Sequence, residues 1–457
     1  MRRDYNFHME REAPQKLDAR PVWLLIAAYA LSFVVLSFFF QSPMDMIRGY
    51  GRILTSPSLL TTDYMALGGC GAALWNAALV LLLLSFYIFI VKIEVSGKSL
   101  AGLVFVTGFA FFGTNPINTL PILCGGFLSA KAHGQTASTT VLATFFATCL
   151  GPVVSFTLFA SDWPLLLALP TGILEGVLIG FLVPQLSESC LNFHGGYTLY
   201  NVGFTAGILG LLAAAVMNYF GFFPEPVRMD LSQGYPGIFA FLQLSFVALI
   251  LSGLMLDSHN GLHYRELLRH SGHQAPDFTR LHGLGLSFVN MGLLGLMASA
   301  AVLVGGVPLN GPVLGSILAV MAFAAIGKHP RNSIPVMLGV GLAVILNPDE
   351  LSPTGRGLAL LFSTALAPLA GEFGLCGGVF VGFIFAMLVN NALNAHVGLN
   401  LYNGGFTSGF VAFLSLPVLR FARSLRRRFK ASRGLPVRKP ADGEKQKEDG
   451  TRGEHES

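Results

Sequence analysis

The sequence HGGYTLYNVGFTAG at residues 194–207 returns as HVGLNLYNGGFTSG at residues 396–409. Nine of the fourteen positions are identical, and they include the uncommon residues His, Tyr and Asn. Such a match about 200 residues further along a chain of 457 residues is hard to reach by chance. It predicts that the whole chain is a duplication of one unit.

The composition is that of a membrane protein. Hydrophobic residues make up 53% of the chain and charged residues 12%, against roughly 25% charged in soluble domains. Apolar runs of about 20 residues recur, which is enough for a helix to cross the hydrocarbon core. The runs lack the alternation of a membrane barrel, so helices are the spanning elements. We expect an all-α polytopic protein of about 12–14 helices, some of them broken or re-entrant.

Further markers repeat in the same order. Asp277-Phe278 echoes Asp63-Tyr64 at an offset of 214 residues, and so does a Pro-x-Asn-x-x-Pro motif at 330–335 and 116–121. The offset then falls to 202 for the opening motif. We therefore predict an N-terminal segment at 1–20, repeats at 21–218 and 236–420, a linker at 219–235, and a disordered tail at 421–457. The basic start of that tail is expected to lie against an anionic cytoplasmic membrane surface.

Positive charges swap between equivalent loops. Lys92 and Lys98 flank one loop of the first repeat, whereas the equivalent residues 304–311 carry no charge. Lys328 and Arg331 surround the second Pro-x-Asn-x-x-Pro motif, whereas the first is uncharged. Basic loops favour the cytoplasm, so the swap predicts inverted repeats, with both termini cytoplasmic.

The Pro-x-Asn-x-x-Pro motifs predict broken helices, because proline removes a backbone donor and clashes with the preceding turn. Broken helices at membrane depth expose backbone groups that a solute can bind. The alternative is a turn at the membrane surface capped by asparagine. The residues concerned are Pro116, Asn118, Pro121, Pro330, Asn332 and Pro335.

The duplicated motif places Asn and Thr four residues apart, on one helix face. The same spacing of Gly203 and Gly207 lets another helix approach closely. The face is a candidate lining for a solute path, and the alternative is a packing face. Its residues are Tyr200, Asn201 and Thr205 with their equivalents Tyr402, Asn403 and Thr407, and the preceding His194 and His396 are expected to be cap or interface residues.

Glu175 and Glu372 are the carboxylates inside apolar sequence, and they do not align with each other. A carboxylate in lipid is costly and suggests a functional role such as ion coupling, although Glu372 is also compatible with a loop. The five cysteines are expected to be small buried hydrophobic residues. The chain contains no nucleotide-binding, metalloprotease or serine-hydrolase motif, so we expect no cofactor, no metal and no nucleic acid.

The paired Leu-Tyr-Asn-x-Gly-Phe-Thr-x-Gly and Pro-x-Asn-x-x-Pro motifs resemble a bacterial family of duplicated membrane proteins of unknown function. That resemblance implies a multi-pass protein of the inner (plasma) membrane. Locally, Asn115-Pro116 and the Gly-Tyr-Thr-Leu-Tyr-Asn at 196–201 are similar to urea transporters, which are inverted duplications around a narrow pore. The Leu-Pro-x-x-x-x-Pro-Phe-Asn signature of those transporters is missing. The similarity implies a transporter-like fold and not urea as the substrate.

A transporter or channel for a small polar solute, with its path between the repeats, is the leading interpretation. A membrane enzyme acting on a lipid-linked substrate and a non-catalytic scaffold or sensor are the alternatives, and an enzyme is less favoured. Transport predicts that Asn118, Asn332, Asn201 and Asn403 converge on one axis, whereas an enzyme predicts acids and histidines gathered at one membrane face. Lipid is the expected surrounding partner, and a homo-oligomer is left open.

Overall fold

The computed structural model describes residues 18–231, 234–257 and 260–433, and every element in these ranges is a helix. The predicted segment at 1–17 and the tail beyond 433 lie outside them. Nine described helices are long and apolar enough to cross a membrane, and three shorter apolar helices accompany them. The prediction of an all-α polytopic membrane protein is confirmed.

The first half of the chain contains ten α-helices and one 3-10 helix. They are α1 (Arg20–Phe40), α2 (Pro43–Leu54), α3 (Tyr64–Gly68), α4 (Cys70–Val91), α5 (Gly97–Phe109), α6 (Pro116–Ala132), α7 (Ala137–Ala147), η1 (Thr148–Leu150), α8 (Gly151–Phe159), α9 (Leu165–His194) and α10 (Asn201–Tyr219).

The second half repeats this order. Its elements are α11 (Pro236–Leu256), α12 (Asn260–Leu267), α13 (Phe278–Leu281), α14 (Gly283–Val304), α15 (Gly311–Ala322), η2 (Phe323–Ala325), α16 (Pro330–Leu346), α17 (Pro353–Phe362), η3 (Ser363–Leu366), α18 (Ala367–Ala395) and α19 (Asn403–Ser432). Helix α18 is kinked at Gly374, whose φ is 78°, and so corresponds to α8 and α9 together.

The chain divides into two units at Phe413, inside α19, and the arrangement described below lies in the first unit. Helix α19 itself continues to Ser432. The predicted disordered tail from 421 is therefore wrong for its first twelve residues, which continue the helix.

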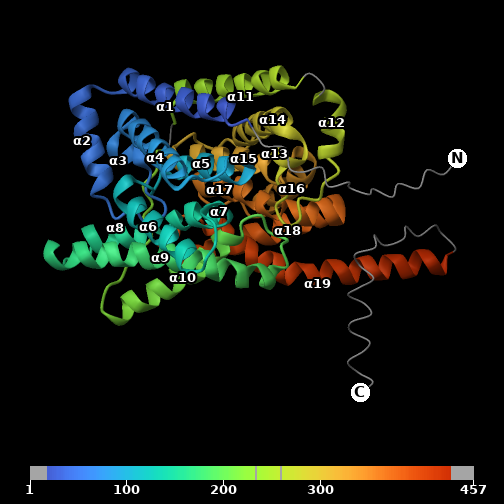
Figure 1. Cartoon of the computed structure of the whole chain (residues 1–457). Coiled ribbons are helices and arrows are strands. Elements are labelled where there is room, and N and C mark those ends of the chain that lie inside the picture. The colour runs from blue at the N-terminus through green and yellow to red at the C-terminus, as the bar shows by residue number, and fades with distance from the viewer. Residues whose placement is uncertain (1–17, 232–233, 258–259, 434–457) are drawn as a thin grey trace. The chain divides into compact units, whose positions relative to one another are not determined.

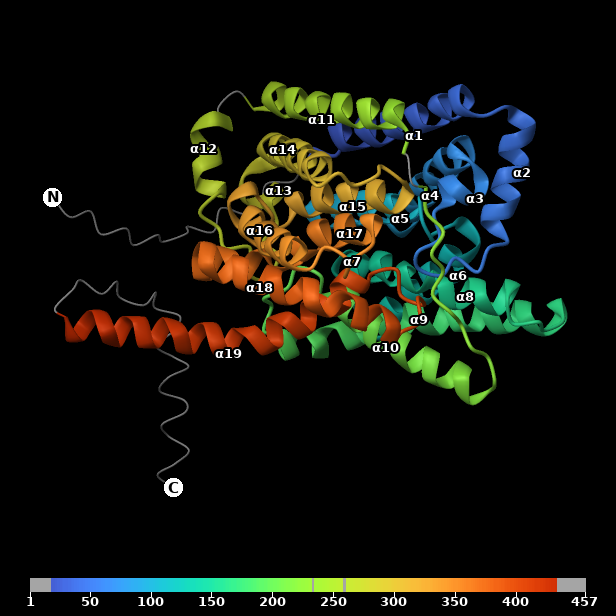
Figure 2. The same ribbon diagram turned by 180° about the vertical axis from the view of Figure 1, so that it is seen from behind.

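Equivalent helices run antiparallel, as inverted repeats require. Helices α5 and α15 lie side by side in the middle of the molecule (Figures 1 and 2), and the N-terminus of each meets the C-terminal end of the other. A Cβ atom on Gly97 would lie 3.0 Å from the Ala325 carbonyl oxygen, and one on Gly311 would lie 2.5 Å from that of Phe111. The inverted relation that the charge swap predicted is therefore confirmed, although one of the charges used, Lys328, is buried and does not lie at the membrane surface.

Each repeat caps the central helix of the other. Asp63 accepts a hydrogen bond from the Gly311 backbone N–H at 3.2 Å, across the repeat boundary. On the equivalent side of the molecule, the Gly97 N–H donates a hydrogen bond to Thr279 Oγ1 at 2.8 Å, and the Thr279 hydroxyl donates to Asp277. Burial raises the pKa of Asp63 to about 6, although the backbone donors oppose this shift. The caps hold the two repeats in register.

The Pro-x-Asn-x-x-Pro motifs begin α6 and α16 rather than interrupt them. Pro116 occupies the first turn, where its missing N–H costs nothing, and Pro330 does the same in α16. Pro121 and Pro335 lie inside these helices and do not end them, so their prediction as helix breaks is wrong. A glycine on the neighbouring helix makes room for each ring: a Cβ on Gly176 would lie 2.7 Å from the Pro121 ring, and one on Gly378 would lie 2.4 Å from the Cβ of Pro335.

The cysteine prediction holds only in part. Cys70 and Cys149 are buried, whereas Cys190 is half-buried and Cys124 and Cys376 are exposed. Cys124 lies on α6 and Cys376 on α18.

Candidate functional site

Two equivalent connections at the centre of the molecule join α5 to α6 and α15 to α16. The Asn76 side chain donates to two carbonyl groups of the first connection, including that of Thr114 at 2.9 Å. The Asn290 side chain donates to two carbonyl groups of the second, including that of Lys328 at 2.8 Å. Thr114 and Lys328 therefore occupy the same place in the two repeats.

Lys328 is fully buried. Its amine donates hydrogen bonds to the Tyr200 hydroxyl and, at 2.7 Å, to Thr364 Oγ1. Nζ also lies 4.3 Å from the centre of the Tyr200 ring, within the range of a cation–π interaction. No carboxylate among the described residues pairs with it. A buried amine held only by hydroxyl groups is costly, and such a group is a candidate functional residue.

Aromatic rings fill the interface between the repeats around this amine. Tyr200 and Tyr402 are equivalent residues, and their ring centres lie 4.6 Å apart. The rings packed on this pair are fully or almost fully buried, and they belong to Phe105, Phe109, Phe146, Phe323 and Phe362. These rings fill the space between the two repeats at the centre of the molecule.

The helices on both sides of the centre change to 3-10 geometry there. Helix α7 passes through η1 into α8, and α17 passes through η3 into α18. The interruptions free carbonyl groups: Cys149 O accepts from the Leu401 N–H, and Ala365 O accepts from the Leu199 N–H, both at 2.9 Å. Broken helices of this kind occur in membranes only where protein or a cavity surrounds them.

A polar vestibule of about 320 Å³ opens on one side of this centre. Its floor is formed by Leu401, Asn403 and Gly404, which adjoin Tyr402 in the chain, and by Phe362, whose ring centre lies 6.0 Å from that of Tyr402. Its rim includes Arg228 and the acidic residues Asp230, Asp349 and Glu350. The lining thus runs from exposed residues at the protein surface to buried residues next to Tyr402 in the chain.

The opposite side of the centre is closed by polar contacts. The Tyr197 hydroxyl donates to Glu372 at 2.5 Å, and its ring centre lies 4.4 Å from that of His273. His273 in turn hydrogen-bonds the Gly195 carbonyl at 2.8 Å. The backbone contact of Gln274 with Gly196 has its equivalent in Leu60 with Gly398, beside the vestibule. The vestibule side is called the open mouth below, and the side with the Tyr197–Glu372 and Tyr197–His273 contacts is called the sealed mouth.

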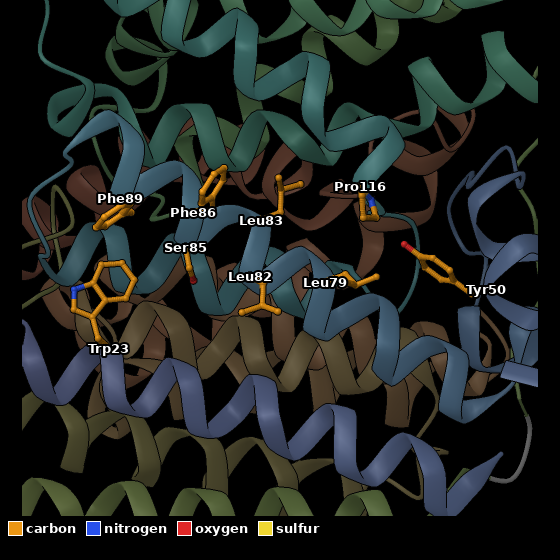
Figure 3. Close-up of a pocket in the computed structure, with 9 residues that line it drawn as sticks. All are labelled: Trp23, Tyr50, Leu79, Leu82, Leu83, Ser85, Phe86, Phe89 and Pro116. Atoms are coloured by element: carbon orange, nitrogen blue, oxygen red, sulfur yellow. The ribbon is translucent and has the colours of Figure 1, made fainter. Parts of the chain in front are cut away.

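A larger hollow of about 910 Å³ lies away from the centre, between α1, α2, α4 and α6 (Figure 3). Its lining is almost entirely apolar and consists of Trp23, Tyr50, Leu79, Leu82, Leu83, Ser85, Phe86, Phe89 and Pro116. In the second repeat the residue equivalent to Tyr50, Tyr264, donates to Asn290 Oδ1 at 3.0 Å. An apolar groove on membrane-spanning helices suits lipid better than a polar solute.

The four asparagines predicted to line a path are occupied by structural hydrogen bonds. Asn118 and Asn332 are fully buried and bond the carbonyls of Gly113 and Gly327, each at 2.9 Å. Asn201 bonds His194 and the Ser187 carbonyl, and Asn403 bonds His396 and the Val389 carbonyl. Of the four, Asn403 alone lines the described vestibule.

The other predicted site residues also divide into residues with structural hydrogen bonds and residues that lie at the centre or in a mouth. Thr205 and Thr407 donate to the backbone carbonyls of Asn201 and Asn403, one turn earlier. Tyr200 and Tyr402 meet at the centre. Glu372 lies in the sealed mouth, whereas Glu175 is half-buried on α9. His194 and His396 link the end of one helix to the start of the next, as their predicted interface role requires.

The sequence interpretation missed Lys328 as a site residue and treated it as a loop charge at the membrane surface. The structure corrects this, because the side chain is fully buried. A signal was available: the residue equivalent to Lys328 is Thr114, so the lysine is not needed to build the connection.

Comparison with family models identifies the family of the chain. A model described as "Protein of unknown function (DUF1576)" matches residues 42–219 and residues 256–421. The chain belongs to this family. The two matched ranges agree with the duplicated, multi-pass architecture, and DUF1576 carries no assigned activity in its description. No curated protein and no solved structure matches the chain, so the local similarity to urea transporters is not supported.

Proposed function

We propose that this DUF1576 protein carries a small polar solute across the membrane between its two repeats. The observation that carries the proposal is the buried, hydroxyl-bound amine of Lys328 at a centre where helices are interrupted on both sides. Such a centre costs folding free energy, and it is the arrangement in which transporters bind solutes near the membrane midplane.

The vestibule and the sealed mouth support alternating access rather than an open pore. The vestibule leads to Tyr402, and the equivalent position on the other side is closed by Tyr197, His273 and Glu372. Inverted repeats can exchange conformations, so that the open mouth closes and the sealed one opens. In this proposal Tyr200 and Tyr402 form the central gate, and Asn403 lines the approach.

We also propose that the protein lies in a plasma membrane with its N-terminus in the cytoplasm. Arg20 begins α1, and Trp23 shares a groove with Phe89 near the end of α4, so the N-terminal end of α1 lies near Lys92. Arg280 pairs with Glu94 nearby. Clustered Lys and Arg favour the cytoplasmic side, which places the vestibule on the outer side.

The test is solute flux in proteoliposomes. Urea, glycerol, acetate and methylammonium are offered to a variant in which Cys124, Cys190 and Cys376 are replaced by alanine. Asn390→Cys adds a thiol in the vestibule lining, and Asn391→Cys adds one on its exposed neighbour outside that lining. A bulky methanethiosulfonate reagent is expected to stop flux in the first variant and not in the second.

Two results would count against the proposal. Absence of flux for every solute would leave transport without support, because the panel covers neutral, anionic and cationic small solutes. Flux that continues after complete modification of Asn390→Cys would place the path elsewhere.

A further inference from the structure

We propose that Thr114 and Thr148 of the first repeat, together with Tyr402 of the second, form a binding site for a small ammonium-type cation, in the place equivalent to the one that the Lys328 amine fills. The ligand class is ammonium or a primary alkylammonium. The inference deepens the proposed transport function, on which it rests for its role in flux. The site itself is argued from the comparison of the two repeats.

The acceptors that hold the lysine in the second repeat have equivalents in the first. Thr364 donates its hydroxyl hydrogen to the Leu361 carbonyl at 2.6 Å and accepts from the amine of Lys328. Thr148, in η1, donates to the Phe145 carbonyl at the same distance. Its oxygen can therefore only accept a further hydrogen bond.

The remaining groups of this place lack the partners that their equivalents have. The Tyr200 hydroxyl accepts a hydrogen bond from the lysine amine, whereas the hydroxyl of its equivalent, Tyr402, is fully buried, faces the Tyr200 hydroxyl and has no such amine donor among the described residues. Thr114 stands at the lysine position, and its Oγ1 is buried without a hydrogen-bond partner among the described residues. Buried polar groups without partners are rare and point to a missing ligand or water.

Neighbouring contacts bring together the segments that carry these groups. The Leu401 N–H donates to Cys149 O, which brings the residue before Tyr402 against the residue after Thr148. A Cβ atom added to Gly113, the residue before Thr114, would lie 2.4–2.6 Å from the Cδ atoms of Leu401. The connection between α5 and α6 therefore also lies against Leu401. The segments that carry Thr114, Thr148 and Tyr402 therefore meet, as the segments that carry Lys328, Thr364 and Tyr200 do around the lysine.

The aromatic surroundings favour a cation. In the second repeat, Nζ of Lys328 lies 4.3 Å from the Tyr200 ring centre and 5.2 Å from that of Phe323. The equivalent pair, Tyr402 and Phe109, has ring centres 5.6 Å apart. Aromatic faces attract ammonium ions, and more strongly where water is excluded. Hydroxyl acceptors with aromatic faces suit an N–H donor with positive charge better than a carboxylate.

The route to this place carries a negative rim. The vestibule ends at Leu401 and Asn403, beside Tyr402, and its rim has three carboxylates and one arginine, Arg228. Asp230 is held there by a hydrogen bond from Thr354. Clefts lined by one sign of charge raise the local concentration of the opposite ion. The acids thus act on the approach, while the hydroxyl groups and rings form the site.

The test is thermal unfolding of the purified full-length protein in detergent, titrated with methylammonium, ammonium, sodium or potassium chloride at constant ionic strength. The two nitrogen cations are expected to stabilise the wild type saturably. Thr114→Lys supplies a built-in ammonium group and is expected to abolish the effect. Lys328→Thr empties the place that the lysine side chain fills. This variant is expected to raise the stoichiometry of methylammonium binding, measured by calorimetry, from one to two.

Tyr402→Phe covers the case in which Thr114→Lys fails to fold. It removes one hydroxyl group and is expected to weaken methylammonium binding about tenfold, the loss of roughly one hydrogen bond to a charged group. Tyr29→Phe is the matched control, because Tyr29 is another buried tyrosine hydroxyl without a partner and lies on α1. Its affinity is expected to equal that of the wild type.

Several results would overturn the site. They are no saturable stabilisation of folded wild type by either nitrogen cation, stabilisation by sodium or potassium instead, or equal binding in the wild type and Tyr402→Phe. Binding without methylammonium flux would keep the site and count against transport of this class. Flux of another solute without cation binding would refute the site alone.

Discussion

The backbones of Gly203 and Gly405 touch where α10 and α19 pass each other: a Cβ atom on Gly405 would lie 2.6 Å from the Cα of Gly203. The same crossing brings Tyr200 and Tyr402 together. Close helix approach at small residues is a main source of association between helices in lipid. The glycines therefore position the two gate tyrosines as well as join the repeats.

Gly405→Ala is expected to destabilise the protein by about 1–3 kcal/mol, because neither backbone can move without disturbing the aromatic centre. Thermal unfolding in detergent measures the effect. The control is Gly341→Ala on α16, where an added Cβ meets nothing within 4 Å and alanine favours the helix. Equal melting temperatures for the two variants would refute the close contact.

The two asparagines that hold the central connections give a second prediction. Asn76→Ala and Asn290→Ala each leave two buried carbonyl groups without their side-chain donor. Each is expected to cost about 2 kcal/mol or more, since an unsatisfied buried group costs roughly 1–3 kcal/mol. Asn391→Ala, at an exposed position, is the control. Unchanged unfolding in both connection variants would contradict the assigned bonds.

The sequence predicted the architecture well because a duplication carries its own evidence. The paired motifs, their common offset and the swapped loop charges led to two inverted repeats, and the spacing of Gly203 and Gly207 led to a close helix contact. These properties follow from residue order and from small-residue spacing, both of which are visible in the sequence.

The candidate site was less predictable, because a polar residue in apolar sequence can bond a solute or its own backbone. Asn403 and Asn201 bond carbonyls fourteen residues earlier on the preceding helix, which periodicity does not reveal. Lys328 looks like a loop charge until the fold brings Tyr200, 128 residues away, onto its amine. The 3-10 turns have a local signal in the sequence, because Pro152 and Pro368 lie just after them inside apolar runs.

The sealed mouth gives a third prediction. Tyr197→Phe removes the hydrogen bond to Glu372, and a bond to a charged group contributes about 1.5–3 kcal/mol. Backbone amide exchange of residues 271–276 is expected to become about tenfold faster or more, since about 1.4 kcal/mol corresponds to a factor of ten. The equivalent residues 57–62, on the vestibule side, serve as the internal control. Faster exchange in both segments would indicate general destabilisation instead of an opened mouth.

The last prediction concerns Lys328 and Tyr200, whose groups satisfy each other in a fully buried place. Lys328→Met leaves the Tyr200 hydroxyl without its donor, and Tyr200→Phe leaves the amine with Thr364 as its hydrogen-bond partner. Removing both groups together avoids a stranded polar atom at this contact, so the double variant is expected to lose less stability than the two single variants combined, by about 1–3 kcal/mol. A cycle of thermal unfolding measurements gives this coupling.

The matched cycle pairs Lys328→Met with Tyr29→Phe on α1 and is expected to be additive to within about 0.5 kcal/mol. Additivity in both cycles would show that the lysine and the tyrosine do not depend on each other, and the central amine would then lose its proposed connection to the gate.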